Sequence, residues 1–157
     1  MTEPETPRFV ADAMVGKLAR WLRVLGLDVL YDSTLDDQQL IALARREGRV
    51  LLTRDVPLAS GTNGPERLLI ESGDFREQLL QVVEAYRLDP WRGLFSRCID
   101  CNTPLEPALR EEAQHRVPPY IFSTKARFMR CERCGKILWE GTHRNHMRQV
   151  LEGLFAK

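Results

Sequence analysis

The first half of the chain alternates between short apolar runs and segments with helical periodicity. The apolar runs predict strands at residues 8–11, 28–31, 50–53 and 67–70. The periodic segments predict a helix between Asp12 and Gly26, and helices at residues 36–47 and 74–86. The apolar face of the first helix is expected to consist of Met14, Leu18, Leu22 and Leu25. Strands that alternate with helices predict an α/β fold, with a parallel sheet flanked by helices.

After Pro90 the pattern changes to short segments around cysteine residues. Helical patterns return at residues 107–115 and at about 143–155. We therefore predict three parts, namely a flexible lead-in at residues 1–7, an α/β domain at 8–90 and a small module with a closing helix at 91–157.

Composition and charge narrow the class of protein. No apolar run approaches the roughly 20 residues that span a membrane, and the acidic start of the chain is unlike a signal peptide, so we expect a cytoplasmic protein. Residues 1–86 hold 10 Lys or Arg and 14 Asp or Glu, a net charge of −4, whereas residues 87–157 hold 13 and 8, a net charge of +5. This division fits a metal site joined to a module that binds a polyanion, although chance scatter gives the same numbers.

An acidic residue follows each predicted strand. These residues are Asp12, Asp36 and Asp37, Asp55, and Asp74. Because parallel strands end at the same edge of a sheet, the carboxylates are expected where α/β proteins bind ligands. Grouped carboxylates repel one another unless a cation neutralises them, and oxygen ligands alone favour magnesium or manganese. The alternative is helix capping, which we favour for Asp74 because it leads directly into a helix.

Basic residues on the first helix are candidates for binding phosphate beside such a metal. Lys17 and Arg20 lie on one stripe of this helix, and Arg23 continues it. For Arg23 we favour a solvated position on the surface. Residues 56–66 are rich in Gly and Pro, which predicts a loop long enough to hang over the same edge of the sheet.

Two CxxC pairs are the most specific chemical signal in the chain. Cys98 and Cys101 form the first pair, Cys131 and Cys134 the second, and four thiolates suit one tetrahedral zinc ion. Gly135 suits the tight turn that a thiolate pair needs. Because four cysteines leave no coordination position open, we predict a structural zinc ion in a C-terminal zinc ribbon.

Cationic and aromatic residues are interleaved around the cysteine pairs. Such a composition suits single-stranded RNA, through ion pairs with phosphate and stacking on bases. Arg127 and Arg130 are candidates for RNA contact, whereas Phe128 and Trp139 are expected in the core of the module. His143, at the start of the last helix, is a further candidate for contact with phosphate, with a surface or packing role as the alternative.

Three stretches of the chain resemble the Mut-seven C-terminal ribonuclease domain. They are FVADAMVGKLARWLRVLGLDVLY, DDQQLIALARREGRVLLTRD and CERCGKILWEGTH, and the resemblance extends from about residue 8 to 150. It implies a PIN-like nuclease with a zinc ribbon, and RNA as the substrate. It favours Asp37 over Asp36. The site that it implies consists of Asp12, Asp37 and Asp55, with Asp74 as a fourth acid, and of Lys17 and Arg20.

We therefore predict a metal-dependent ribonuclease that hydrolyses RNA at an acidic magnesium or manganese site, with a structural zinc ribbon that assists RNA binding. The alternative is a non-catalytic RNA- or ribosome-binding protein with the same PIN-like fold. A phosphoacceptor receiver domain is disfavoured, because we find no lysine after a fifth strand. The resemblance leaves open a ubiquitin-like or antitoxin-type protein partner, and the sequence leaves the oligomeric state open.

Overall fold

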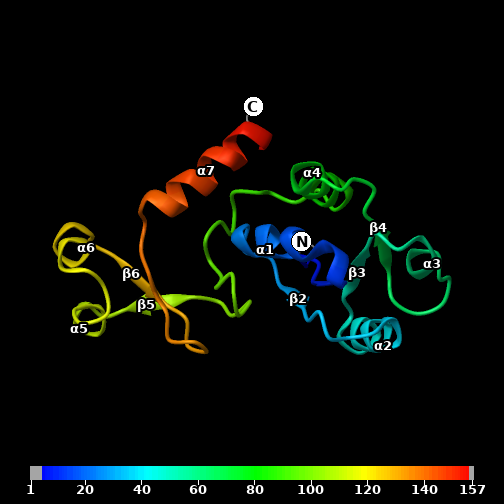
Figure 1. The fold of residues 1–157 in the computed structure, drawn as a ribbon, viewed down its shortest axis with the longest axis horizontal. Helices are drawn as coiled ribbons and strands as arrows, with labels where there is room; N and C mark the ends of the chain where they lie inside the picture. The colour runs from blue at the N-terminus through cyan, green and yellow to red at the C-terminus, as the bar shows by residue number, and fades with distance from the viewer. Residues whose placement is uncertain (1–4, 156–157) are drawn as a thin grey trace. The chain divides into compact units, whose positions relative to one another are not determined.

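A computed structural model describes residues 5–155 and contains two compact units, Met1–Asn102 and Thr103–Lys157 (Figure 1). The lead-in predicted at residues 1–7 lies mostly outside the described residues, and residues 5–7 belong to no helix or strand. The units divide after Asn102, later than the domain boundary expected after residue 90, so the first cysteine pair is counted with the first unit. None of the described helices is long and apolar enough to cross a membrane.

The first unit is built on a four-stranded parallel sheet with the strand order β2-β1-β3-β4. The strands are β1 (Phe9–Ala11), β2 (Val29–Tyr31), β3 (Val50–Thr53) and β4 (Arg67–Leu69). β1 lies between β2 and β3, with Val10 opposite Leu30 on one side and Leu51 on the other. The α/β fold with a parallel sheet flanked by helices, predicted from the sequence, is therefore confirmed.

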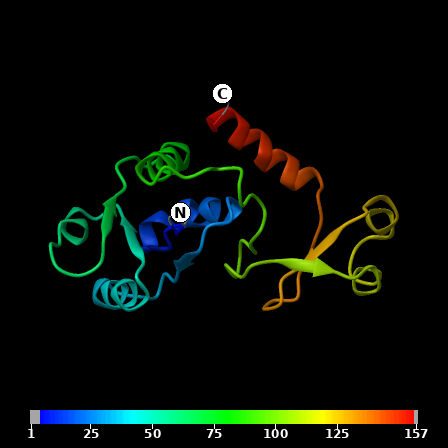
Figure 2. The ribbon, with the colours of Figure 1, turned by 180° about the vertical axis from the view of Figure 1, so that it is seen from behind.

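Helices connect these strands and cover both faces of the sheet. They are a 3-10 turn, η1 (Ala13–Val15), and the helices α1 (Gly16–Val24), α2 (Asp37–Glu47), α3 (Val56–Ala59) and α4 (Phe75–Ala85). The two views in Figures 1 and 2 show α1 and α4 side by side on one face and α2 on the other. Val10 and Leu51 pack against Leu40 and Ala44 of α2, which places one half of the core on that face.

Two details of the first unit differ from the sequence prediction. Met14 is 59% exposed and does not belong to the apolar face, because the segment starts as a 3-10 turn and buries Val15 instead. The predicted loop at residues 56–66 begins with the short helix α3. This helix forms because Asp55 caps its start and a proline, Pro57, occupies its first turn.

The second unit contains a small antiparallel sheet with the strand order β5-β6-β7. Its elements are β5 (Glu106–Ala108), α5 (Arg110–Ala113), α6 (Pro119–Thr124), β6 (Phe128–Arg130), β7 (Ile137–Leu138) and α7 (Thr142–Phe155). Phe128 is buried with Ile121 and Ile137, and Trp139 packs against this cluster. The core positions of Phe128 and Trp139 and the closing helix are therefore confirmed.

The helix predicted at residues 107–115 is wrong in its first part. Pro107 lies in β5, which pairs with β6, and the helix α5 begins only at Arg110. β5 is an edge strand, where the missing N–H of a proline does not have to break the ladder of hydrogen bonds. The pairing partner of this segment is distant in sequence, so local periodicity does not reveal it.

Candidate functional site

Two of the predicted acids follow adjacent strands of the parallel sheet. Asp12 comes directly after β1, and Asp55 comes two residues after the end of β3, which pairs with β1. Asp12 is only 6% exposed. Its Oδ1 accepts a hydrogen bond from the backbone N–H of Met14 at 2.9 Å, so it caps η1. The carboxyl ends of these two strands therefore bring two carboxylate-bearing residues to the same edge of the sheet.

Thr53 links these two acids through its hydroxyl group. The Thr53 hydroxyl donates a hydrogen bond to Oδ2 of Asp12, and its oxygen accepts one from the backbone N–H of Asp55 at 2.9 Å. Thr53 is completely buried. The sequence does not mark this residue, because a polar side chain is an ordinary end for an apolar strand.

Asp36 and Asp37, at the start of α2, differ in their hydrogen bonding. Asp36 caps α2, because its carboxylate accepts a hydrogen bond from the backbone N–H of Gln39 at 2.8 Å. The Gln39 side chain in turn accepts a hydrogen bond from the backbone N–H of Asp36 at 2.8 Å. Asp37 is exposed, and its carboxylate pairs with no residue that the structure describes. The geometry therefore leaves Asp37, rather than Asp36, available to a ligand.

Asp74 is a helix cap, which is the role we favoured for it. Its carboxylate accepts a hydrogen bond from the backbone N–H of Arg76 at 2.9 Å, at the start of α4. Among residues 5–155, the one group of three or more metal-binding side chains with closely spaced ligand atoms is the set of four cysteines. The structure thus places Asp12 and Asp55 at one edge of the sheet but does not bring three of the predicted carboxylates within a shared coordination sphere.

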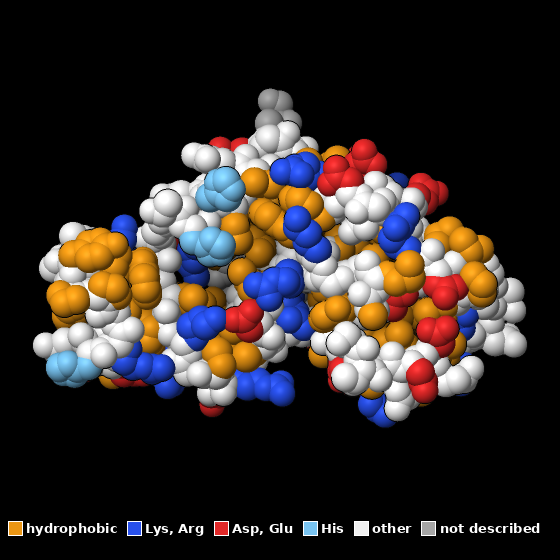
Figure 3. Space-filling view, viewed as in Figure 1, with side chains coloured by type: hydrophobic (Ala, Val, Ile, Leu, Met, Phe, Trp, Pro, Cys, Tyr) orange, Lys and Arg blue, Asp and Glu red, His pale blue; other side chains and the backbone are white. Residues whose placement is uncertain are grey.

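Lys17 borders a surface cleft beside this edge. The cleft has a volume of about 320 Å³, and its lining includes Met14, Lys17, Gly73, Asp74, Phe75 and Arg76. Lys17 Nζ lies 4.3 Å from the centre of the Phe75 ring, and the ring of Trp21 stacks on Phe75 with 5.2 Å between the ring centres. On the face shown in Figure 3, acidic and basic side chains are interspersed over the first unit.

Arg20 and Arg23 contact the two residues between Cys98 and Cys101, and neither lines the cleft. Arg20 forms a 3.1 Å ion pair with Asp100. Arg23 is 7% exposed and donates hydrogen bonds to the backbone oxygens of Val29 at 2.9 Å and Ile99 at 2.8 Å. Burial, reinforced by the positive charge of Arg20, lowers the pKa of Arg23. The solvated position that we favoured for Arg23 is therefore wrong, because its guanidinium group holds residue 99 against the parallel sheet.

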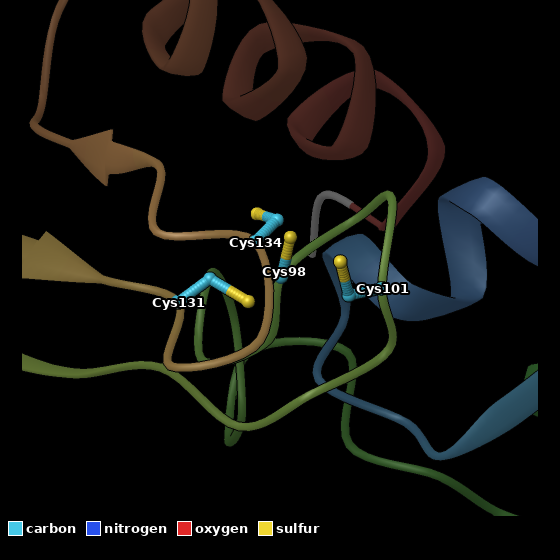
Figure 4. Close-up of side chains that lie close together, drawn as sticks. All are labelled: Cys98, Cys101, Cys131 and Cys134. Carbon is cyan, nitrogen blue, oxygen red and sulfur yellow. The ribbon is translucent and has the colours of Figure 1, made fainter.

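The four cysteines form one compact cluster. The Sγ atoms of Cys98, Cys101, Cys131 and Cys134 all lie within 4.8 Å of one another, and their side chains converge in Figure 4. A tetrahedral zinc ion with Zn–S bonds of about 2.3 Å holds its sulfur ligands roughly 3.8 Å apart. The cluster therefore fits a structural zinc site, as the two CxxC pairs predicted.

Both cysteine pairs are closed by the same turn. The residue after each pair, Asn102 or Gly135, adopts the left-handed conformation, with φ of 66° and 76°. The backbone N–H of Asn102 donates a hydrogen bond to the carbonyl of Cys98, and that of Gly135 donates one to the carbonyl of Cys131, each at 2.8 Å. Gly135 was expected in this role, whereas Asn102, a residue type that tolerates the left-handed region, was not.

The candidate RNA-binding residues of the second unit lie in different environments. Arg127 is exposed and pairs with no residue in the described part of the chain. Arg130 forms ion pairs with Glu106 at 2.5 Å and Glu112 at 3.5 Å. His143 is exposed near the start of α7. The structure therefore separates Arg127, whose charge is uncompensated, from Arg130, whose charge is balanced by two carboxylates.

The chain matches a known protein family. Residues 7–151 match the family model described as the Mut7-C RNAse domain, which covers nearly the whole chain. No curated protein and no solved structure matched the chain.

Proposed function

Since this chain belongs to the Mut7-C RNase domain family, we propose that it is a metal-dependent ribonuclease that hydrolyses the phosphodiester bonds of RNA. The observation that supports the proposal best is the hydrogen-bonded link from the Asp55 backbone through Thr53 to Asp12. Such a link fixes the ends of two adjacent strands and orients a buried carboxylate toward the edge where α/β proteins bind ligands.

In this proposal Asp12, Asp37 and Asp55 would hold magnesium or manganese, because these hard cations prefer carboxylate oxygens and a bound cation would draw the three carboxylates together. Such a metal lowers the pKa of bound water and stabilises negative charge on phosphate. Thr53 holds the Asp12 carboxylate in one orientation, as outer hydrogen-bond partners of metal ligands do. Asp74, which caps α4, is the proposed fourth acid of this edge.

The second unit is proposed to assist RNA binding while the zinc ion holds it together. The four clustered cysteines support the structural role of zinc, and the net charge of +5 over residues 87–157 supports RNA binding. Arg127 and His143 are exposed and are proposed to contact phosphate.

The test is cleavage of a labelled single-stranded RNA with manganese and without any added divalent metal. The wild type should cleave only with manganese, and Asp12→Asn and Asp37→Asn should abolish cleavage while leaving the fold intact. Asp36→Asn is the matched control, since asparagine caps a helix as well as aspartate does and the variant should stay active. Full activity of Asp12→Asn at saturating manganese would refute the proposal.

A non-catalytic RNA-binding protein is the second candidate function. The observation that favours it is that Asp12, Asp55 and Asp74 each accept a backbone N–H at the start of a helix, which is a sufficient structural role. Such a protein binds the labelled RNA but shows no manganese-dependent product at any metal concentration, so the same experiment separates the two functions.

A further inference from the structure

Arg54 stands between two residues of the proposed site and lacks a partner. It directly follows Thr53 at the end of β3 and precedes Asp55. Its Nε is buried and forms no hydrogen bond, and no described residue forms an ion pair with its guanidinium group. The positive charge of this guanidinium group is therefore uncompensated within the described residues, and an anionic ligand would balance it.

The guanidinium group of Arg54 lies beside Gly73, a residue that lines the cleft described above. A Cβ atom added to Gly73 would lie 3.6 Å from Nη1 of Arg54, so the two residues are in contact distance. Gly73 lines the cleft together with Lys17 and Phe75. Arg54, the residue after β3, therefore lies against one wall residue of the cleft, whereas Lys17 of α1 lines the cleft itself.

Lys17 supplies a second cation whose charge is uncompensated. Its Nζ lies against the Phe75 ring, and it pairs with no carboxylate in the described chain. Arg76 also lies over this ring, but its Nη1 is 4.0 Å from Oδ1 of Asp74, so its charge is partly balanced. Asp74 is the carboxylate of the cleft lining, and it already accepts the backbone N–H of Arg76.

We propose that Arg54 and Lys17 form a phosphate-binding subsite in this cleft, which takes a phosphodiester group of single-stranded RNA. The inference rests on the proposed ribonuclease function and names two positioning residues for its substrate. A guanidinium group binds two phosphate oxygens at once, and an ammonium group adds a point charge. A phosphate held by Arg54 lies next to the strand end that carries Asp55, which places the RNA backbone beside the acids.

The test measures binding of a fluorescently labelled oligouridine in buffer without added magnesium or manganese, where cleavage is not supported and the structural zinc stays bound. Arg54→Gln and Lys17→Gln should each weaken binding about tenfold, the typical worth of a hydrogen bond to a charged group. Each should also flatten the slope of log affinity against log salt by about 0.7, the value for one phosphate contact on a single strand. Arg46→Gln is the matched control, because Arg46 is exposed near the end of α2, at the opposite edge of the sheet, and should change neither quantity.

A pair of variants at Gly73 tests the same subsite without removing Arg54. Gly73→Glu and Gly73→Gln add side chains of equal size, but only the glutamate places a negative charge beside the guanidinium group. Gly73→Glu should therefore weaken RNA binding more than Gly73→Gln. If Arg54→Gln fails to fold, the difference in RNA affinity between the two Gly73 variants still tests the subsite.

The outcomes separate the subsite from the proposed function. Wild-type affinity and salt slope in both Arg54→Gln and Lys17→Gln, or equal affinities of the two Gly73 variants, would overturn the subsite. If the subsite is overturned but the wild type still cleaves RNA with manganese, the proposed ribonuclease function is retained. If the wild type binds oligouridine but never cleaves RNA, the ribonuclease function is refuted, and the subsite is then tested by the binding measurements alone.

Discussion

The side-chain amide of Asn102 donates a hydrogen bond to the Asp28 carboxylate, with 2.7 Å between Nδ2 and Oδ1. The Asn102 side-chain oxygen accepts a second hydrogen bond, from the backbone N–H of Val29 at 3.0 Å, at the start of β2. Arg97 donates to the backbone oxygens of Gly26 and Asn102. The residue that closes the first cysteine turn is thus part of the parallel-sheet unit, so this turn is held in place by contacts other than zinc.

Replacing Asn102 should therefore destabilise the first unit. Asn102→Ala leaves the backbone N–H of Val29 without its acceptor, which should lower the free energy of unfolding by about 1–3 kcal/mol. Asn102→Gly loses the same hydrogen bonds but restores freedom in the left-handed region, so it should be destabilised less. Urea denaturation of the two variants and the wild type measures both effects, and equal stability of all three would contradict the prediction.

The Asp28 carboxyl should make stability depend on pH in the acid range. Burial alone would raise the pKa of Asp28, but hydrogen bonds from Arg49 and Asn102 outweigh it and lower that pKa in the folded protein. A carboxyl with a lowered pKa stabilises the fold above its unfolded pKa of about 4, and this contribution is lost as pH falls through the folded value. Asp28→Asn should be less stable than the wild type at neutral pH, and its decline below about pH 4 should be shallower.

Unfolding midpoints measured from neutral pH downward check this sign. Both proteins carry the same four cysteines, so competition between protons and zinc is common to the two curves and cancels in their difference. Parallel curves would show that Asp28 does not contribute.

The parallel sheet and the acidic edge could be predicted from the sequence because the signals are local. An apolar run followed by an acid and a helical pattern fixes both the strand and the end at which the acid lies. Asp12 and Asp55 were found in this way. Arg23 was misjudged, because helical periodicity gives the face of a helix but not the segment that covers it, here Ile99 from far along the chain.

Thr53 and Arg54 show a second limit of the sequence. Thr53 ends a buried strand and Arg54 separates it from a capping acid, and polar residues are ordinary at such a position. Their roles depend on hydrogen bonds, made by Thr53 and missing for Arg54, that only the folded chain reveals. The two cysteine turns also differ in how well the sequence predicts them. Glycine at position 135 is a strong indication of a left-handed residue, whereas asparagine at position 102 is a weaker one.

Removing the Thr53 hydroxyl should impair metal-dependent cleavage. Thr53→Val keeps the shape of the side chain but leaves Asp12 without one of its hydrogen-bond donors. Loss of such a partner typically costs about 10–100-fold in metal affinity or activity. Thr53→Ser retains a hydroxyl group and should stay close to the wild type. Cleavage rates across a manganese titration measure the effect, and an unchanged manganese requirement in folded Thr53→Val would argue against this role.

Zinc removal should unfold the second unit and spare the first. Structural zinc supplies on the order of 10 kcal/mol to a small module, and the described core of residues 103–155 is small. Cys131→Ser, or a strong chelator, should therefore expose the backbone amides of β5–β7 to hydrogen exchange, while those of β1 and β3 stay protected. Hydrogen exchange read by mass spectrometry checks this. Elemental analysis that finds no zinc in the native protein would refute it.

Arg127 and Arg130 should differ in their contribution to RNA binding, although the sequence offered both as contacts. The charge of Arg130 is already balanced by Glu106 and Glu112, so a phosphate would have to compete with two carboxylates for it. Arg127 has no such partner in the described chain, and its exposed guanidinium group meets a phosphate without losing an ion pair. We therefore expect Arg127, rather than Arg130, to bind phosphate.

Arg127→Gln should weaken RNA binding and flatten its salt slope by about 0.7, the value for one phosphate contact on a single strand. Arg130→Gln should leave the slope nearly unchanged and lower the stability of the second unit slightly, because half-exposed ion pairs contribute up to about 1 kcal/mol. Both are measured with the catalytically inactive Asp12→Asn protein as background, so that cleavage does not remove the RNA. Equal slopes for Arg127→Gln and the background protein would place the RNA-binding charge elsewhere, with Arg54 and Lys17 as the next residues to test.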